Sequence, residues 1–295
     1  MQTKKKIQQL LALAGVSPNK RLGQHFLIDL NLMRLLVDSA NIQNNDVVLE
    51  VGCGTGSLTE ALALLAGEVI TVEVDRTLAE ITKRQLSKAK NVKIINTDVL
   101  ENKNTISQTV ASALSLAQKK YSGRVLLVAN LPYNVASPVI LNLVTGPMIA
   151  DSMYVTVQKE VASRITAVLG SRDYSSLSIH LSATGEVRTI RILKPTVFWP
   201  QPQVDSAMVS FARKKEKLDQ IQNMQLFNET VNLFMNHRRK MLKSCIKSAH
   251  SRLAKINNWP ELFEQCSIDS TQRPEQLSPR DYIAIANQCY RLLKP

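Results

Sequence analysis

Short hydrophobic runs alternate with segments of helical periodicity through the first two thirds of the chain. Residues 46–51 form an apolar, β-branched run that ends at a glycine cluster. Similar runs occupy residues 69–74, 92–95, 125–128 and 153–158, and apolar side chains recur at helical spacing in residues 57–65, 77–89 and 159–169. Strands that alternate with helices predict β-α-β units, hence an α/β fold with a mainly parallel sheet covered by helices on both faces.

The pattern changes to helical periodicity alone after residue 211. A charged linker at residues 213–217 precedes helical patterns at residues 222–235, 237–253, 261–266 and 279–293. We therefore expect two domains, residues 1–213 and a small all-helical domain of residues 214–295. Within residues 237–253, Arg239, Lys243 and Lys247 recur every four residues, which places them on one face of the expected helix.

Composition excludes several classes of protein. The chain is 44% hydrophobic and 21% charged, which is typical of a globular protein. No apolar run approaches the ~18 residues that a membrane span needs, and the apolar part of the N-terminal segment is too short for a secretory signal. The four cysteines are widely spaced without metal-ligand spacing, so we expect reduced thiols, no metal site and a cytoplasmic protein.

The formal charge of +13 is concentrated in two stretches. Residues 1–24 contain five cations and no acid, and residues 213–255 contain eleven cations and three acids. Local concentrations of this kind indicate a polyanion that is bound at particular places on the surface.

A glycine-rich segment at the end of the first predicted strand indicates a nucleoside site. Glycines at 52, 54 and 56 allow a ligand to approach the backbone, and Glu73 at the end of the next strand can accept hydrogen bonds from ribose hydroxyls. The spacing GxGxG lacks the third glycine of the dinucleotide pattern GxGxxG, which favours S-adenosylmethionine over NAD. A tight turn without a ligand is the plainer alternative.

Two further segments follow predicted strands. Asp98 can accept a hydrogen bond from the exocyclic amine of the cofactor's adenine, although an acid at this place is also common in turns. Asn130-Leu131-Pro132-Tyr133 is the most specific signal in the chain. The amide oxygen of Asn130 and the carbonyl of Leu131 can accept hydrogen bonds from the amino group of a base. Pro132 stiffens the turn, and Tyr133 can stack on a base that has left its helix.

Six ordered motifs resemble those of the KsgA-type ribosomal RNA small-subunit adenine dimethyltransferases. They are the segments at residues 21–27, 48–59, 130–138, 158–164, 198–206 and 237–240. The resemblance implies a Rossmann-like class I methyltransferase fold with a helical RNA-binding domain at its C-terminal end.

The resemblance also assigns roles to single residues. It implies cofactor contacts at His25, Leu27, Gly52, Gly54, Glu73, Asp98 and Asn130. His25 departs from the family, which more often has Asn there, so a main-chain contact is expected to survive while a side-chain role stays open. Tyr133 and Phe198 match the aromatic residues expected to sandwich the target adenine, with an inter-strand core position as the alternative for Phe198. RNA contacts are expected at Arg238, Arg239, Lys240, Lys243 and Lys247.

The activity implied by the resemblance is transfer of two methyl groups from S-adenosylmethionine to the N6 amine of each of two adjacent adenines. These adenines would lie in a hairpin loop near the 3′ end of small-subunit rRNA, in an immature subunit bound by a monomeric enzyme. The alternatives are a large-subunit rRNA dimethyltransferase of the antibiotic-resistance type, an NAD-dependent oxidoreductase, and an assembly factor that binds RNA without methylating it.

Overall fold

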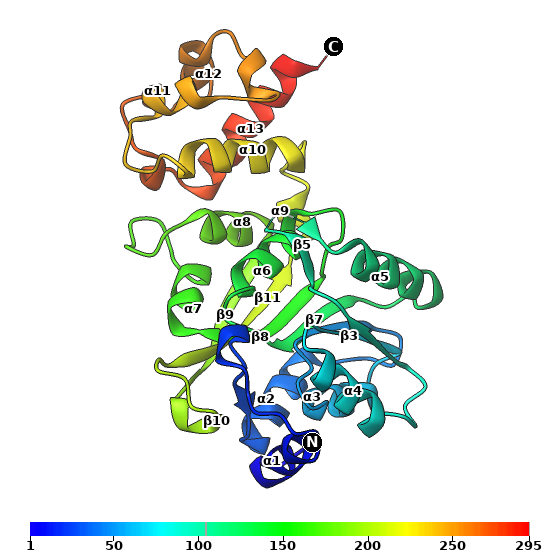
Figure 1. Ribbon diagram of the computed structural model, residues 1–295. Coiled ribbons are helices and arrows are strands. Elements are labelled where there is room, and N and C mark those ends of the chain that lie inside the picture. The colour runs from blue at the N-terminus through cyan, green and yellow to red at the C-terminus, as the bar shows by residue number, and fades with distance from the viewer. Residues whose placement is uncertain (104, 295) are drawn as a thin grey trace. The chain divides into compact units, whose positions relative to one another are not determined.

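The computed structural model describes residues 1–103 and 105–294, which form two compact units (Figure 1). The first unit contains Met1–Ala162 and Arg188–Ala212, and the second contains Ser163–Val187 and the residues from Arg213 onward. The division expected at residue 213 therefore differs from the structure in one segment: Ser163–Val187 precedes residue 213 in the sequence but belongs to the C-terminal unit. Helix α8 (Ser176–Thr184) groups with the C-terminal unit because its buried Ile179 and Ala183 share a core with Phe227.

A seven-stranded sheet in the order β4-β3-β2-β7-β8-β11-β9 forms the centre of the first unit. Its strands are β2 (Val47–Val51), β3 (Glu68–Glu73), β4 (Val92–Asn96), β7 (Val125–Asn130), β8 (Ser152–Gln158), β9 (Gly185–Leu193) and β11 (Ser206–Arg213). The strands from β4 to β8 in this order run parallel, and β11 is antiparallel to β8. The predicted mainly parallel sheet and its five predicted strands are confirmed.

Both faces of this sheet are covered. Successive side chains of a strand point to opposite faces, and Leu126, Leu127, Val128 and Ala129 of β7 are all fully buried. Leu126 and Val128 pack in one core with residues of α2 and α3, while α5 packs against β2 and β3. A parallel sheet buried on two sides explains why the strand sequences are continuously apolar rather than alternating.

The helices of the first 170 residues include three that the spacing predicted. Helices α3 (Ser57–Ala63), α4 (Arg76–Gln85) and α7 (Lys159–Ile165) confirm the expected helices, and each ends earlier than expected. The others are α1 (Lys4–Leu13), η1 (Lys20–Leu22), α2 (Leu30–Ala40), α5 (Gln108–Lys120) and α6 (Ala136–Thr145). Two short strand pairs complete this part: β1 (Phe26–Leu27) with β10 (Phe198–Trp199), preceded by η2 (Pro195–Val197), and β5 (Leu100–Asn102) with β6 (Thr105–Ile106). No helix of the described residues is long and apolar enough to span a membrane.

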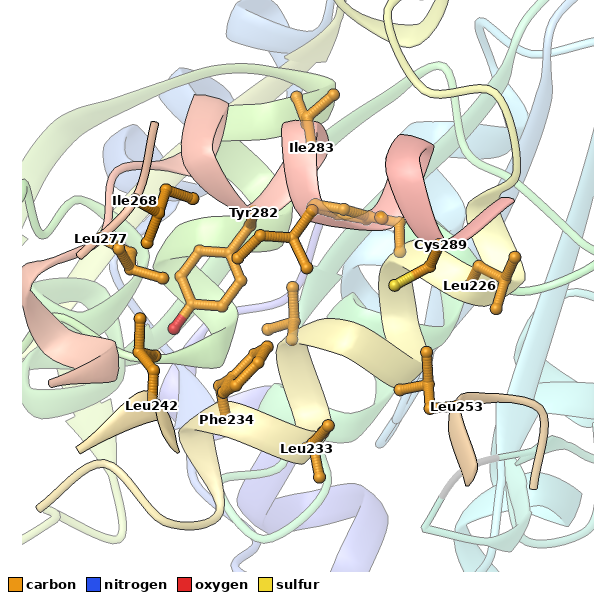
Figure 2. Packing of buried hydrophobic residues seen from close by; sticks show 14 of the residues in the cluster. Leu226, Leu233, Phe234, Leu242, Leu253, Ile268, Leu277, Tyr282, Ile283 and Cys289 are labelled. Carbon is orange, nitrogen blue, oxygen red and sulfur yellow. The ribbon is translucent and has the colours of Figure 1, made fainter. Parts of the chain in front are cut away.

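The C-terminal unit is helical and has a hydrophobic core of its own (Figure 2). Its helices are α8, α9 (Lys215–Leu218), α10 (Met224–Met235), α11 (Leu242–Cys245), η3 (Ile246–Ser248), η4 (Leu253–Lys255), α12 (Trp259–Gln265), η5 (Pro274–Gln276) and α13 (Pro279–Leu293). The ring of Phe234 lies 6.1 to 6.4 Å, centroid to centroid, from the rings of Trp259, Phe263 and Tyr282. These contacts join α10, α12 and α13 around one centre.

The continuous helix expected over residues 237–253 is wrong. Met241 is extended, and the amides of Leu242 and Lys243 donate to the carbonyls of Gln272 and Ser270 instead of forming helical hydrogen bonds. Only Leu242–Cys245 is α-helical in this stretch, and a 3-10 turn follows it. The cations at 239, 243 and 247 therefore do not lie along one face of a helix.

Glu50 is a carboxyl group buried inside the first unit. It lies in β2 with 1% of its surface exposed, and its Oε2 accepts hydrogen bonds from Thr59 (2.6 Å) and Thr71 (2.8 Å). Burial raises the pKa of Glu50 to about 7, and the nearby carboxylate of Glu73 acts in the same direction, while the two hydroxyl groups oppose it. The folded protein therefore holds a proton at Glu50 under conditions in which the unfolded chain releases it.

This raised pKa predicts a loss of stability with rising pH. Above the ordinary pKa of 4.5 the unfolded state binds fewer protons at Glu50 than the folded state, so the free energy of unfolding falls until pH passes about 7. Between pH 4.5 and 7, the free energy of unfolding of Glu50→Gln should rise by about 2 to 3 kcal/mol relative to that of the wild type. Urea unfolding across this range measures the difference. Glu80→Gln, at an exposed position, is the control, and its difference from wild type in free energy of unfolding should not change with pH. A difference for Glu50→Gln that is equally independent of pH contradicts the prediction.

Candidate active site

The carboxyl ends of β2, β3 and β7 open into one cavity of the first unit. Ten of the residues selected from the sequence line it: His25, Leu27, Gly52, Gly54, Glu73, Asp98, Asn130, Leu131, Pro132 and Tyr133. Parallel strands end at the same edge of a sheet, and ligands of open α/β sheets bind at that edge. The structure therefore brings together residues that lie up to 108 positions apart in the chain, from His25 to Tyr133.

The glycine-rich turn after β2 has little room for a side chain at Gly52 or Gly54. Gly52 and Gly54 have φ angles of 82° and 58°, in the left-handed region that favours glycine. A Cβ at Gly54 would lie 2.8 Å from the ring of Phe26, and one at Gly52 would lie 3.1 Å from the side chain of Pro132. The two glycines thus let the N-terminal segment and the Asn130–Tyr133 segment approach the turn closely.

Glu73 lines the cavity from the end of β3. Its Oε2 accepts the amide of Gly54 and its Oε1 accepts the amide of Asp75, both at 3.0 Å. The side chain is 6% exposed, and burial raises its pKa against the opposing effect of these two amides. Each carboxylate oxygen keeps a further lone pair for a ligand hydroxyl group.

Asp98 lies at the exposed rim of the cavity. Its Oδ1 accepts the amide of Leu100 at 2.9 Å, which forms the turn that the sequence left open as an alternative. The carboxylate nevertheless lines the cavity, next to the apolar Val99. A turn contact and a ligand contact are compatible because a carboxylate has two oxygens.

Asn130 presents an unused acceptor at the end of β7. Its Nδ2 donates to the main-chain carbonyl of His25 at 2.8 Å. A carbonyl can only accept, so this contact fixes which way the amide group points. Asn130 Oδ1 is buried and has no hydrogen-bond partner in the part of the chain that the structure describes. A buried oxygen without a partner is uncommon in folded proteins, and Asn130 lines the cavity, where an N–H group of a ligand could supply one.

The next three residues, Leu131 to Tyr133, also line the cavity. Leu131 is buried, and its amide donates to the carbonyl of Thr156 in the neighbouring strand at 3.1 Å. The hydroxyl groups of Tyr133 and Ser206 are 2.7 Å apart, and burial raises the pKa of Tyr133. The Tyr133 ring is half-buried, so an aromatic surface is held at the cavity wall.

Phe198 is not part of this wall. It is 1% exposed, pairs with Leu27 across β1 and β10, and packs in the core beneath α2. This placement favours the inter-strand core position over contact with a base. Its neighbour Trp199 is half-buried and stacks on Phe26, with ring centroids 6.2 Å apart.

Helix α1 forms a cavity wall that the sequence interpretation missed. Ile7 lines the cavity and packs with Leu10, Leu11 and Phe26. The buried Gln2 joins this helix to the glycine-rich turn: its amide nitrogen Nε2 donates to the carbonyl of Thr55 at 2.9 Å. The spacing of residues 7, 10 and 11 was the available signal, because it gives a short helix one apolar face.

The cavity is rich in acidic groups. Glu50, Glu73 and Asp98 line it, and no Lys or Arg of the described residues does. Burial is the main cause of the raised pKa of the Cys53 thiol, and the carboxylates of Glu73 and Glu50 raise it further. A cavity of this kind favours a ligand with positive charge. Within the described residues, no group of three His, Cys, Asp or Glu side chains is arranged to hold a metal ion.

The cations selected for RNA contact lie in the C-terminal unit and fall into two groups. Arg238 donates two hydrogen bonds to Glu275, at 3.0 and 2.8 Å, so its charge is compensated within the protein. Arg239, Lys240, Lys243 and Lys247 are exposed, and none forms a salt bridge to a described residue.

Comparison with known proteins places the chain in a family. The model of the ribosomal RNA adenine dimethylase family matches residues 15–288. Ribosomal RNA small subunit methyltransferase A of Latilactobacillus sakei is 34% identical over 283 residues, which cover 95% of this chain and 92% of the relative. The protein of the same name from Listeria monocytogenes is 36% identical over 280 residues, 95% of this chain and 93% of the relative.

Solved structures show the same architecture. A dimethyladenosine transferase from Plasmodium falciparum superposes with a TM-score of 0.68 at 21% identity, over 87% of this chain and 94% of that protein. The 23S rRNA methyltransferase ErmE superposes with a TM-score of 0.60 at 20% identity, over 90% and 99%. The resemblance found in the sequence is thus confirmed, and the chain, with its Rossmann-like class I methyltransferase fold, belongs to the ribosomal RNA adenine dimethylase family.

Proposed function

We propose that this enzyme dimethylates the N6 amines of two adjacent adenines in a hairpin loop near the 3′ end of small-subunit rRNA, in an immature subunit. Its family makes it an S-adenosylmethionine-dependent rRNA adenine dimethyltransferase. The choice of the small subunit is supported by curated relatives that share the name Ribosomal RNA small subunit methyltransferase A. The observation that supports the catalytic assignment is the orphaned, buried Oδ1 of Asn130 in the cavity.

The chemistry of an exocyclic amine explains the need for such an oxygen. The lone pair of the adenine N6 nitrogen is delocalised into the ring, so the nitrogen is a poor nucleophile. Acceptors that hold its two N–H groups let the nitrogen become pyramidal and present its lone pair. Asn130 Oδ1 and the carbonyl of Leu131 are our candidates, and Tyr133 supplies a surface on which an extruded base can stack.

The residues of the cavity fit S-adenosylmethionine. When bound, this cofactor supplies an electrophilic methyl group on a sulfonium centre. Glu73 would accept hydrogen bonds from the ribose hydroxyls of the cofactor, and Asp98 would accept one from its adenine amine. The turn at Gly52 and Gly54 would pack against the cofactor. The carboxyl groups of the wall favour a ligand with a sulfonium charge.

The helical unit would hold the RNA backbone in this proposal. The exposed cations of residues 239–247 can neutralise phosphates without reading sequence. We further propose that the enzyme acts as a monomer in the cytoplasm on an immature small subunit.

Loss of the orphaned oxygen should stop methyl transfer while cofactor binding stays measurable. We expect Asn130→Ala to lower the rate of methyl transfer by about 100-fold or more, since one acceptor aimed at the transition state is worth roughly that much. The assay uses methyl-labelled cofactor and immature small subunits, followed by mapping of dimethyladenine; calorimetry follows cofactor binding. The exposed Asn232→Ala on α10 is the matched control.

Two outcomes would contradict these assignments separately. Wild-type enzyme that modifies other RNA and leaves small subunits unmodified overturns the substrate. Full activity of Asn130→Ala overturns the role of that side chain.

Removal of the Glu73 carboxylate should act on the cofactor alone. We expect Glu73→Ala to weaken cofactor binding by roughly 10- to 100-fold, since it removes hydrogen bonds to a charged group. Calorimetry measures the affinity, and the exposed Glu80→Ala on α4 controls for loss of one negative charge. Unchanged affinity would remove Glu73 from the cofactor site.

The four exposed cations should set the salt dependence of RNA binding. Replacing Arg239, Lys240, Lys243 and Lys247 together by Ala should flatten the plot of log affinity against log salt by roughly 0.7 to 0.9 for each lost phosphate contact. The matched control removes four exposed cations on or just after α4: Lys83, Arg84, Lys88 and Lys90. Equal slopes for both quadruple variants would show that net charge, and not this cluster, binds the RNA.

A further inference from the structure

We propose that His25 is a positioning residue that holds the ring of Tyr133 in place as the platform for the target adenine. The inference rests on the proposed function of the Asn130–Tyr133 segment and assigns a role to the His25 imidazole. His25 contacts three residues of two segments: Asn130 and Tyr133 at the end of β7, and Pro200 after β10. The three contacts use different groups of the residue, so each can be considered by itself.

The main chain of His25 orients Asn130. Its carbonyl oxygen accepts Nδ2 of Asn130 at 2.8 Å, which directs Asn130 Oδ1 away from His25. Any side chain at position 25 leaves this contact available. Variants at this position therefore test the imidazole without removing the acceptor proposed for the amine.

The imidazole is fixed by a hydrogen bond at one nitrogen. His25 Nδ1 lies 2.7 Å from the carbonyl oxygen of Pro200. Because that oxygen is only an acceptor, Nδ1 has the proton and donates it. The hydrogen bond thereby ties the ring to the segment that follows β10.

The same ring stacks on Tyr133. The two ring centroids are 5.4 Å apart and the planes differ by 28°. The Tyr133 hydroxyl lies 2.7 Å from Oγ of the fully buried Ser206. Tyr133 is thus held at one ring face by His25 and at its tip by Ser206, and a base would stack on the opposite face. A platform that is already immobile loses less conformational entropy when the base arrives.

Three substitutions separate the two contacts of the imidazole. His25→Ala removes the stack and the hydrogen bond. His25→Asn keeps a donor that can reach toward Pro200 but has no ring, and His25→Phe keeps a ring but has no donor. The matched control is His250→Ala, an exposed histidine of the C-terminal unit.

The experiment measures methyl transfer in a single turnover on immature small subunits, with cofactor saturating. We expect His25→Ala and His25→Asn to slow transfer by about 3- to 10-fold, the effect of one aromatic contact. His25→Phe should restore most of the rate. Cofactor affinity should stay at the wild-type value, because the main-chain carbonyl remains, and the melting temperature should fall by only roughly 2 to 4 °C. In a Tyr133→Leu background, His25→Ala should have no further effect.

Each contrary result overturns the inference. A wild-type rate for His25→Asn shows that the stack is dispensable, and a slow His25→Phe shows that the hydrogen bond is what matters. A parallel loss of melting temperature and cofactor affinity shows a structural role only. An additive loss in the Tyr133→Leu background shows that His25 does not act through Tyr133. If wild-type enzyme gives no dimethyladenine, the proposed function fails instead, which is a different result from active wild type with equally active variants.

Discussion

The parallel register of β3, β2 and β7 is the constraint on which the proposed site depends. Val51 pairs with Val72, and Leu49 pairs with Leu127, so Gly52, Glu73 and Asn130 all emerge at one edge of the sheet. The strands are buried on both faces, and a shift by one residue would turn every side chain to the other face. The strand register that packs the sheet is therefore also the register that places the site residues at one edge.

Burial at this edge makes the pairing of polar groups decisive. Glu50 is satisfied by two threonine hydroxyls, and Glu73 by two backbone amides. Asn130 donates to His25, yet its own oxygen has no hydrogen-bond partner among the described residues. An unpaired buried oxygen costs stability, and the surrounding contacts keep it in that state. The arrangement fits the target amine that we propose, which brings N–H groups.

Charge is distributed differently in the two units. The cavity of the first unit has carboxyl groups in its wall and no Lys or Arg of the described residues. The C-terminal unit exposes Arg239, Lys240, Lys243 and Lys247, while Arg238 and Arg252 are paired with Glu275 and Glu229. Phosphate contacts supply affinity that is independent of sequence, whereas a base is selected by the shape and hydrogen bonds of a pocket. The separation of charges fits both tasks in one chain.

The sequence by itself determined the α/β class, the five parallel strands, the glycine-rich turn and the segment from Asn130 to Tyr133. These features depend on patterns of neighbouring residues, which sequence records directly. Only the tertiary structure decided that Phe198 is buried, that residues 237–253 are not one helix, and that His25 stacks on Tyr133. Each of these depends on partners far away in the chain: Leu27 for Phe198, the carbonyls of residues 270 and 272 for the break at Met241, and a tyrosine 108 positions after His25. Local periodicity contains no information about such partners, because folding alone brings them into contact.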